Sequence, residues 1–199
     1  MQNSIKKLYL PALIILIILT MCGCAKYKSE PFAPIGLNQK IEVKENIQAA
    51  KKALTEEECK IFFDRRVINA GYQPIQISIR NNSNQNYILN SNNIDLPIVS
   101  IQDVTKQIQR NPITKGLKYF VIGGPLLGAL EGLNSQSINN KMTADFNSRC
   151  LDENKIVHIK PNQSINTVVF VPKDQTKIDN FDLKLTNPEN NKSVILHLS

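Results

Sequence analysis

The sequence predicts a mainly β fold, an antiparallel sandwich of about seven or eight short strands. Three observations support this prediction. Apolar and polar residues alternate with a period of two in several short stretches, polar turn residues separate those stretches, and helical stretches do not stand regularly between them. A parallel βαβ sheet requires such regular helices, so antiparallel hairpins fit the pattern better.

The first elements of the fold are predicted in residues 41–63. Residues 41–44 alternate apolar and charged side chains and predict a short strand. Thr55 then precedes three glutamates, and Glu58 stands where a capping box places its acidic partner. We therefore expect a short helix that begins after Thr55 and ends at about Phe63.

The clearest strand pattern covers residues 75–80, where three isoleucines at every second position predict one buried face. A turn at 81–84, a strand at 87–89 and a second turn at 90–93 follow. Residues 94–101 contain two short apolar runs that Pro97 separates, which indicates a sheet edge or a bend. The remaining predicted strands are 155–160, 167–171, 181–186 and 194–198. An immunoglobulin-like sandwich is the architecture we expect.

Between the two sets of strands, residues 105–152 interrupt the β pattern as a helical insertion. Its centre, 119–133, is the most apolar stretch after residue 24, and Gly124, Gly128 and Gly132 are spaced four apart. This run packs on the domain, self-associates or touches a membrane, and of these we expect packing against the edge of the sandwich. Residues 136–150 predict a helix whose buried side is Ile138, Met142 and Phe146.

The N-terminal residues follow the order of an export signal. Lys6 and Lys7 precede a mostly apolar run from 8 to 19, and small and thiol residues end it at Cys22-Gly23-Cys24. An uncleaved anchor is the alternative, although a run of about twelve residues is short of the roughly 20 that span a bilayer. We expect residues 1–23 to be a signal peptide, 24–40 a flexible tether and 41–199 one sandwich domain with its insertion at about 105–152.

The segment that ends in Gly23-Cys24 resembles the signal peptide of bacterial lipoproteins. In that family a small residue precedes a cysteine that receives a diacylglycerol, and further acylation adds a palmitate-type chain. Gly23 fits this pattern and Met21, before Cys22, fits it poorly. The resemblance implies that Cys24 is the lipidated residue and that the domain is exported to the cell envelope. Because Ala25 and not aspartate follows Cys24, it also implies the outer membrane and its periplasmic or outer face.

The body of the chain resembles small uncharacterised lipoproteins of Gram-negative, often host-associated, bacteria. The resemblance rests on the capped helix after Thr55, on the 71–77 entry into a strand, on the glycine-rich insert and on the late 169–172 strand. A weaker similarity, of architecture only, is to the small β-sandwich lipoproteins that anchor secretion machinery in the outer membrane. Neither resemblance implies an activity or a functional residue besides Cys24.

Charge and composition argue against several classes of partner. The basic residues behind the net charge of +7 are scattered and never form a block of five or six like charges, so we expect no nucleic-acid partner. The chain contains no tryptophan, which disfavours a stacking platform for bases or sugars. We expect the membrane and an envelope protein as partners, and we identify no small-molecule substrate.

Two cysteines, Cys59 and Cys150, follow the lipidation site. In an oxidising compartment they could form a disulfide that closes a long loop. Alternatively, both are small buried apolar residues on separate helices. The sequence leaves these two interpretations open.

The sequence shows no catalytic or metal-binding motif. His158 and His197 lie in predicted strands, and no Cys, Asp or Glu stands at ligand spacing from them. We therefore expect no metal, no cofactor and no catalytic residue, and a structural or protein-interaction role. An envelope hydrolase is the alternative, and it requires one of these histidines to meet a serine or a carboxylate in the folded chain.

Overall fold

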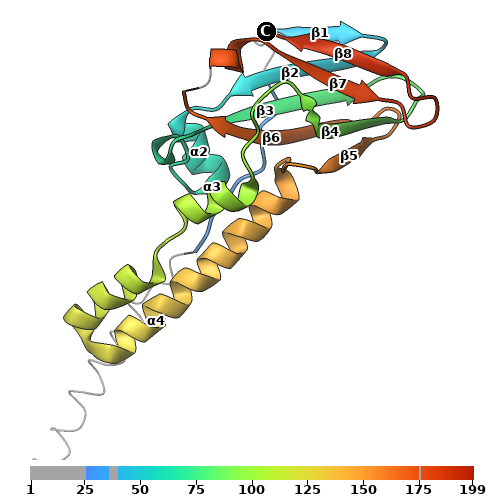
Figure 1. The fold of residues 1–199 in the computed structure, drawn as a ribbon. Coiled ribbons are helices and arrows are strands. Elements are labelled where there is room, and N and C mark those ends of the chain that lie inside the picture. The colour runs from blue at the N-terminus through green and yellow to red at the C-terminus, as the bar shows by residue number, and fades with distance from the viewer. Residues whose placement is uncertain (1–25, 36–39, 175) are drawn as a thin grey trace, which may run out of the picture.

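The structure is a computed structural model that describes residues 26–35, 40–174 and 176–199. Within those residues the chain forms eight strands in two antiparallel four-stranded sheets, ordered β1-β2-β3-β6 and β5-β4-β7-β8 (Figure 1). The strands are β1 (Ile41–Lys44), β2 (Ile47–Ala53), β3 (Tyr72–Asn81), β4 (Tyr87–Ile94), β5 (Ile156–Ile159), β6 (Ser164–Pro172), β7 (Phe181–Thr186) and β8 (Ser193–Leu198). The prediction of a mainly β, antiparallel fold is confirmed. The immunoglobulin-like connectivity stays a prediction.

The two sheets enclose one apolar core. Ile75, Ile77 and Ile79 of β3 are buried in the same cluster as Leu183 and Leu185 of β7. This cluster draws on both sheets, so the architecture is a sandwich with alternating inward side chains. The sequence pattern of 75–80 and 181–186 predicted these buried faces correctly, because period-two alternation leaves one face apolar.

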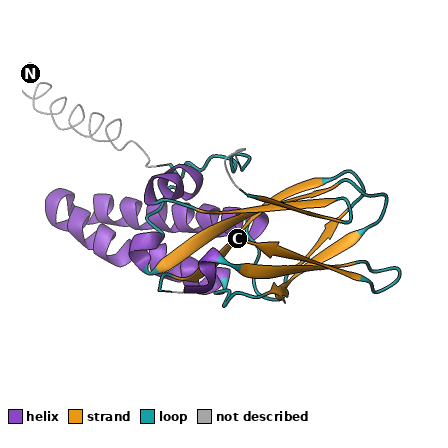
Figure 2. Cartoon of the chain, turned by 90° about the horizontal axis from the view of Figure 1, so that it is seen from above, coloured by secondary structure: helices purple, strands orange, loops and turns teal. Residues whose placement is uncertain are grey.

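A second apolar core lies on the outer side of the first sheet. Val169 and Val171 of β6 point into the sandwich, whereas Val168 and Phe170 belong to a separate cluster with helical residues. A strand that is buried on both faces has a continuous apolar sequence, which is why 167–171 stood out in the sequence as a buried strand. Figure 2 shows the helices gathered at one end and the sheets at the other.

The helices that cover this second core begin with side-chain caps. α2 (Glu56–Phe63) begins after Thr55, whose hydroxyl accepts from the Glu58 backbone while the Glu58 carboxylate accepts from the Thr55 backbone, so the predicted capping box is confirmed. α3 (Ile101–Ile108) begins after Ser100, which accepts from the backbone of Asp103. Two short 3-10 turns, η1 (Ile68–Ala70) and η2 (Thr176–Asp179), complete the described helical elements.

The longest helical element, α4 (Pro112–Arg149), doubles back on itself (Figure 1). The Asn139 side chain donates to the Arg110 carbonyl (2.8 Å) and accepts from the Arg110 amide (3.0 Å). In a straight helix, residues 112 and 139 would stand about 40 Å apart, so the chain must reverse between them. Gly124-Pro125 lies halfway, and glycine and proline are the residues that kink or break helices. We call residues 112–138, which form this hairpin, the arm.

The predicted buried side of the 136–150 helix is confirmed. Ile138, Met142 and Phe146 are all buried. Packing of 119–133 on the sandwich, by contrast, is wrong: no described residue between 109 and 137 belongs to either apolar core. α2, α3 and the last turns of α4 cover the outer face of the sheet around Val168 and Phe170, and the insert extends away from it as the arm (Figure 1).

Two local predictions also differ from the structure. β2 was not predicted, because its sequence, IQAAKKA, is rich in alanine and lysine, which favour helices. It is held as a hairpin with β1 by Glu45 and Asn46, both at positive φ. The turn predicted at 90–93 is instead a continuation of β4, whose register with β7 shifts between Leu89 and Ile94. This irregularity allows Leu89 and Ile94, an odd number of positions apart, to be buried together.

Candidate functional site

Residues 26–35, which the sequence assigned to a flexible tether, are packed against the helices, and we call them the strap. Phe32 makes edge contacts with Phe62 (5.7 Å between ring centroids) and Phe63 (5.6 Å). The Glu30 amide donates to the Ile61 carbonyl of α2 (3.1 Å). In Figure 1 the strap is the blue segment that runs from the sheet along the helices toward the arm. Its prolines suggested a flexible linker, but the contacts of its aromatic residues hold this segment in one position.

Arg149, at the end of α4, joins the strap to both helices. Its guanidinium donates to the Glu30 carbonyl of the strap (2.7 Å) and to the Phe62 carbonyl of α2 (2.6 Å), and it forms an ion pair with Asp145. The guanidinium also lies over the Phe32 ring, 4.7 Å from its centroid. A planar group with several donors suits such a junction, where one side chain satisfies carbonyls from two segments.

The strap is fixed a second time at Tyr27. Its hydroxyl donates to the Asp145 carboxylate (2.7 Å), and the burial of the ring together with this hydrogen bond raises the pKa of the Tyr27 phenol. Arg65 lies over the ring, 5.5 Å from its centroid. Tyr27 therefore contacts both a carboxylate and a guanidinium. Because the strap begins at Lys26, these contacts hold it close to its first residue.

Arg65 itself is almost completely buried. One guanidinium nitrogen donates to the Asp64 carbonyl (2.6 Å), while its Nε and the other terminal nitrogen have no partner in the part of the chain that the structure describes. Burial lowers the pKa of Arg65, the nearby Asp64 opposes that effect, and the positive charge of Arg110 adds to it. Arg65 is thus a buried guanidinium whose charge is balanced by its ion pair with Asp64 (3.2 Å).

The arm beyond this junction exposes apolar side chains. Ile113, Leu117 and Val121 are 78%, 62% and 78% exposed, and Leu133 on the returning segment is 66% exposed. The first three are spaced four apart and so form a stripe along one helical face. Exposed apolar side chains that line up in this way indicate an interaction surface.

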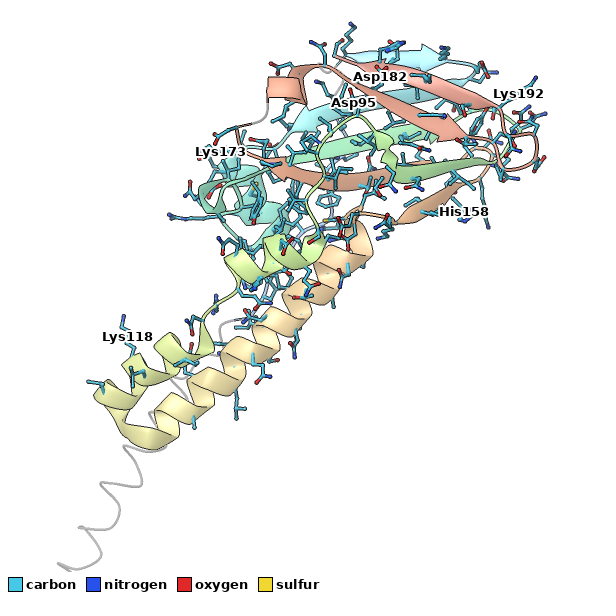
Figure 3. The ribbon with its side chains drawn as sticks, in the orientation of Figure 1. Asp95, Lys118, His158, Lys173, Asp182 and Lys192 are labelled. Atoms are coloured by element: carbon cyan, nitrogen blue, oxygen red, sulfur yellow. The ribbon has the colours of Figure 1, made fainter. Side chains whose placement is uncertain are left out.

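The arm and its base also carry a basic charge. Residues 104–144 contain five basic residues, Lys106, Arg110, Lys115, Lys118 and Lys141, and one acidic residue, Glu131. Figure 3 shows Lys118 projecting from the far part of the arm. No helix of the described residues is long and apolar enough to cross a membrane.

The two histidines lie apart from this surface. His197 Nδ1 is 2.5 Å from an oxygen of Asp182, its direct neighbour across β7 and β8. The two side chains are 67% and 52% exposed, and they border a small pocket of about 240 Å³ that Asp95 and Ser199 also line. The Ser199 hydroxyl accepts from Lys40 (2.5 Å), and no hydrogen bond joins it to His197 among the described residues. His158 lies away from this pair, on β5.

A cleft of about 640 Å³ runs between β5 and β6 and is lined by Phe32, Arg149, Lys155 and His158. Its cations already have acceptors: Lys155 donates to the carbonyls of Asn147 and Cys150 at 2.8 Å each, and Arg149 holds the strap. Among the described residues no group of three metal-binding side chains gathers in one place. The cleft therefore lies where the strap meets the edges of the sheets. Lys155 and Arg149 already donate to protein carbonyls, so neither is free to bind a ligand there.

Cys59 and Cys150 are both free and buried in the second core. Burial, with Glu56 and Glu58 nearby, raises the pKa of the Cys59 thiol to about 12. Burial also raises the pKa of Cys150. Each thiol is therefore protonated at neutral pH and packs as a small apolar group, Cys59 on α2 and Cys150 directly after α4, where it bridges to Val168. The disulfide stays a prediction.

Cys22 and Cys24, the alternative lipidation sites, lie outside the described residues. The strap begins at Lys26, so one residue separates it from Cys24. No family model, curated protein or solved structure matches the chain. The strap and the Arg149 network were not predicted from the sequence. The signal that could have found them was Tyr27 and Phe32, two aromatic residues in a stretch that otherwise resembles a linker.

Proposed function

We propose that this chain is a lipid-anchored module of the cell envelope, acylated at Cys24, with a structural or protein-interaction role and no enzymatic activity. The observation that carries the proposal is the strap. Tyr27 and Phe32 hold the chain against α2 and α4 immediately after the predicted lipid site. A lipid at Cys24 would therefore attach the folded domain to the membrane over a very short reach and leave the sandwich facing outward from it.

The lipid site is tested by metabolic labelling with a palmitate analogue. Cys22→Ser should still be labelled and Cys24→Ser should not, because only Cys24 follows a small residue as lipoprotein processing requires. If Cys24→Ser is still labelled and Cys22→Ser is not, the lipidated residue is Cys22. Fractionation of envelopes tests the membrane: we propose the outer membrane, since Ala25 follows Cys24, and recovery with inner-membrane markers would refute that part.

The interaction role is tested by crosslinking in intact cells. A photo-crosslinker at Ile195, an exposed position on the outer face of β8, should capture one envelope protein in stoichiometric amounts. Arg66, an exposed position beside the helices, serves as the matched control site. An interaction through this face of β8 is refuted when both sites capture the same set of abundant proteins in trace amounts.

A second candidate, an envelope hydrolase, has one observation in its favour, which is the contact between His197 and Asp182 beside Ser199. A serine-directed phosphonate probe tests it. We expect no labelling, because the pair is exposed to solvent and the Ser199 hydroxyl is bonded to Lys40. Labelling that disappears in both Ser199→Ala and His197→Asn would favour the hydrolase.

A further inference from the structure

We infer that the arm is a membrane-surface device whose tip, residues 119–130, inserts into one leaflet of an anionic bilayer beside the lipid at Cys24. This inference rests on the proposed function, since it takes the lipid anchor as given. Three properties of the molecule support it: the length of the uncharged tip, the charge around it, and its position relative to the start of the strap.

The tip has the size of an interfacial insertion. The twelve residues between Lys118 and Glu131 carry no charge, and the chain reverses near their middle. Two antiparallel helical segments of about six residues reach a depth of about 9 Å, within the 5–10 Å to which amphipathic elements enter the boundary between headgroups and acyl chains. A spanning helix needs about 20 apolar residues, so the tip would enter one leaflet and stop there.

The charge on the arm matches an anionic membrane surface. The arm carries Lys115, Lys118 and Glu131, and three further basic residues, Lys106, Arg110 and Lys141, lie at its base. Lys118 stands at one border of the uncharged tip, exposed to solvent (Figure 3), and Glu131 stands at the other border. Lysines near an anionic leaflet are attracted to its surface charge. An uncharged tip with basic residues behind it places apolar groups in the acyl region and cations at the phosphates. A protein partner does not require an uncharged tip to be followed by a layer of basic residues.

The strap brings the arm to the membrane. Tyr27 is bonded to Asp145, and the three residues from Cys24 to Tyr27 extend at most about 10 Å. From Asp145 to the reversal near Pro125 the helix extends about 30 Å, and the strap runs toward that same end of the molecule (Figure 1). The arm is therefore about 20 Å longer than the greatest distance at which residues 24–27 can hold the domain from the membrane. A lipid held at Cys24 brings the tip into contact with the bilayer.

The exposed stripe on the arm requires a cover. Ile113, Leu117 and Val121 lie in water in the structure, and neither described apolar core extends to them. Stripe and tip are continuous along the same helical segment. The bilayer covers both when the arm lies at a slant to the surface.

Fluorescence depth measurement tests the inference, and the chain suits it because it contains no tryptophan. Val121→Trp places a single fluorophore on the arm. Val43→Trp, on β1 and 59% exposed, places a matched one on the sandwich. The full-length processed lipoprotein with each substitution is reconstituted into vesicles of phosphatidylcholine with or without phosphatidylglycerol. Lipids brominated along the acyl chains then quench only a tryptophan that has entered the bilayer.

We expect a blue-shifted emission and several-fold stronger quenching for Val121→Trp than for Val43→Trp, with a larger effect in the anionic vesicles. Adding Lys118→Gln to Val121→Trp should reduce the anionic preference. Equal quenching at the two positions in vesicle-bound protein overturns the inference. A blue shift without quenching also overturns it, since the arm is then covered by a second copy or another protein. Acylation is measured separately by the palmitate label, so loss of the label refutes the anchor whatever the fluorescence of the Val121→Trp variant reports.

Discussion

The two faces of β6 show how differently the two cores of this molecule are built. On its inner face, Val169 and Val171 join a mainly aliphatic core that the two four-stranded sheets enclose. On its outer face, Val168 and Phe170 join a core in which phenylalanine rings and thiols are mixed with aliphatic side chains, most of them supplied by separate helices. The first core is held between two hydrogen-bonded sheets. The second is held by a few large side chains.

This difference implies a gradient of local stability. Side-chain packing rather than a β-ladder holds the helical layer on the sheet, so it should open before the sandwich does. The arm stands at the far end of the gradient, since its described apolar side chains between 109 and 137 touch neither core. Regions that engage partners are commonly drawn from the low end of such a gradient.

The largest effect is expected where the two cores meet. Phe170→Ala removes a ring that stacks on Phe146 (5.5 Å between centroids) and lies 5.6 Å from Phe63. A buried phenylalanine truncated to alanine costs about 3–5 kcal/mol. Urea denaturation should show this loss, and hydrogen exchange should rise in the helices and in β6. Leu185→Ala, in the sandwich alone, is the matched control. Faster exchange confined to the helices would show that the cores are independent.

A smaller effect is expected from the strap. Arg149→Met keeps the apolar stem and removes the bonds to Glu30, Phe62 and Asp145. Losing charge-assisted bonds of this kind costs about 2–3 kcal/mol. Limited proteolysis should then cut the strap, whereas Arg66→Met, at an exposed position, should leave it resistant. A strap that stays resistant in Arg149→Met would mean that Phe32 and Tyr27 suffice to hold it.

Most of the sandwich could be predicted from sequence because its cause is local. Alternation at 75–80 and 181–186 fixes which face of a strand is buried, and Thr55 with Glu58 fixes where α2 begins. β2 could not be predicted this way, since Ala49, Ala50 and Lys51 favour a helix and their strand conformation comes from pairing with β3 on one side and β1 on the other.

The strap and the arm could not be predicted because their causes lie far along the chain. The strap is fixed by Arg149 and Asp145, more than a hundred residues from Tyr27 and Glu30. The reversal of α4 is fixed by Asn139 acting on the backbone of Arg110. The glycine spacing in 124–132 correctly indicated a helical insert. Its predicted packing against the sandwich was wrong, because the spacing of residues along a helix does not determine which surface the helix contacts.

An effect of about 1 kcal/mol is expected at the start of α2. Glu58→Ala breaks the capping box and the ion pair with Lys52. Glu57→Ala, the matched control, changes an exposed carboxylate of the same turn that the capping box does not use. Both are compared by thermal melts at neutral pH. Equal shifts in Tm would show that the helix responds to the charge of the first turn and not to the capping box.

The same residue gives a pH dependence. Burial alone would raise the pKa of Glu58, but its bonds to Lys52 and Thr55 outweigh burial and lower it. A carboxylate whose folded pKa is lowered stabilises the fold above its unfolded value of about 4.3, and this contribution is lost as the pH falls through the folded value. The difference in stability between wild type and Glu58→Ala should therefore shrink below about pH 4. A difference that stays constant down to about pH 2 would contradict this assignment.

The smallest effect is expected on the arm. Val121→Asp replaces a side chain that is 78% exposed, so the free energy of unfolding in water should change by less than about 0.5 kcal/mol. Met142→Asp, at a fully buried position of the same helical element, should clearly destabilise the helical layer, because it places a carboxylate in the second core. A large loss from Val121→Asp would mean that the arm is part of the core in solution, and the gradient described above would be wrong.

The strap also determines how the molecule responds to mechanical force. A pull on the chain at Lys26 acts first on the Tyr27 contact with Asp145 and on the Arg149 bonds to Glu30, before it reaches β1. Because the strap runs alongside α4, these contacts are stretched together, in shear, and each adds to the resistance. Tension between the membrane and whatever the sandwich holds would thus be borne by the helical layer, and the sheets would keep their register until the strap had detached.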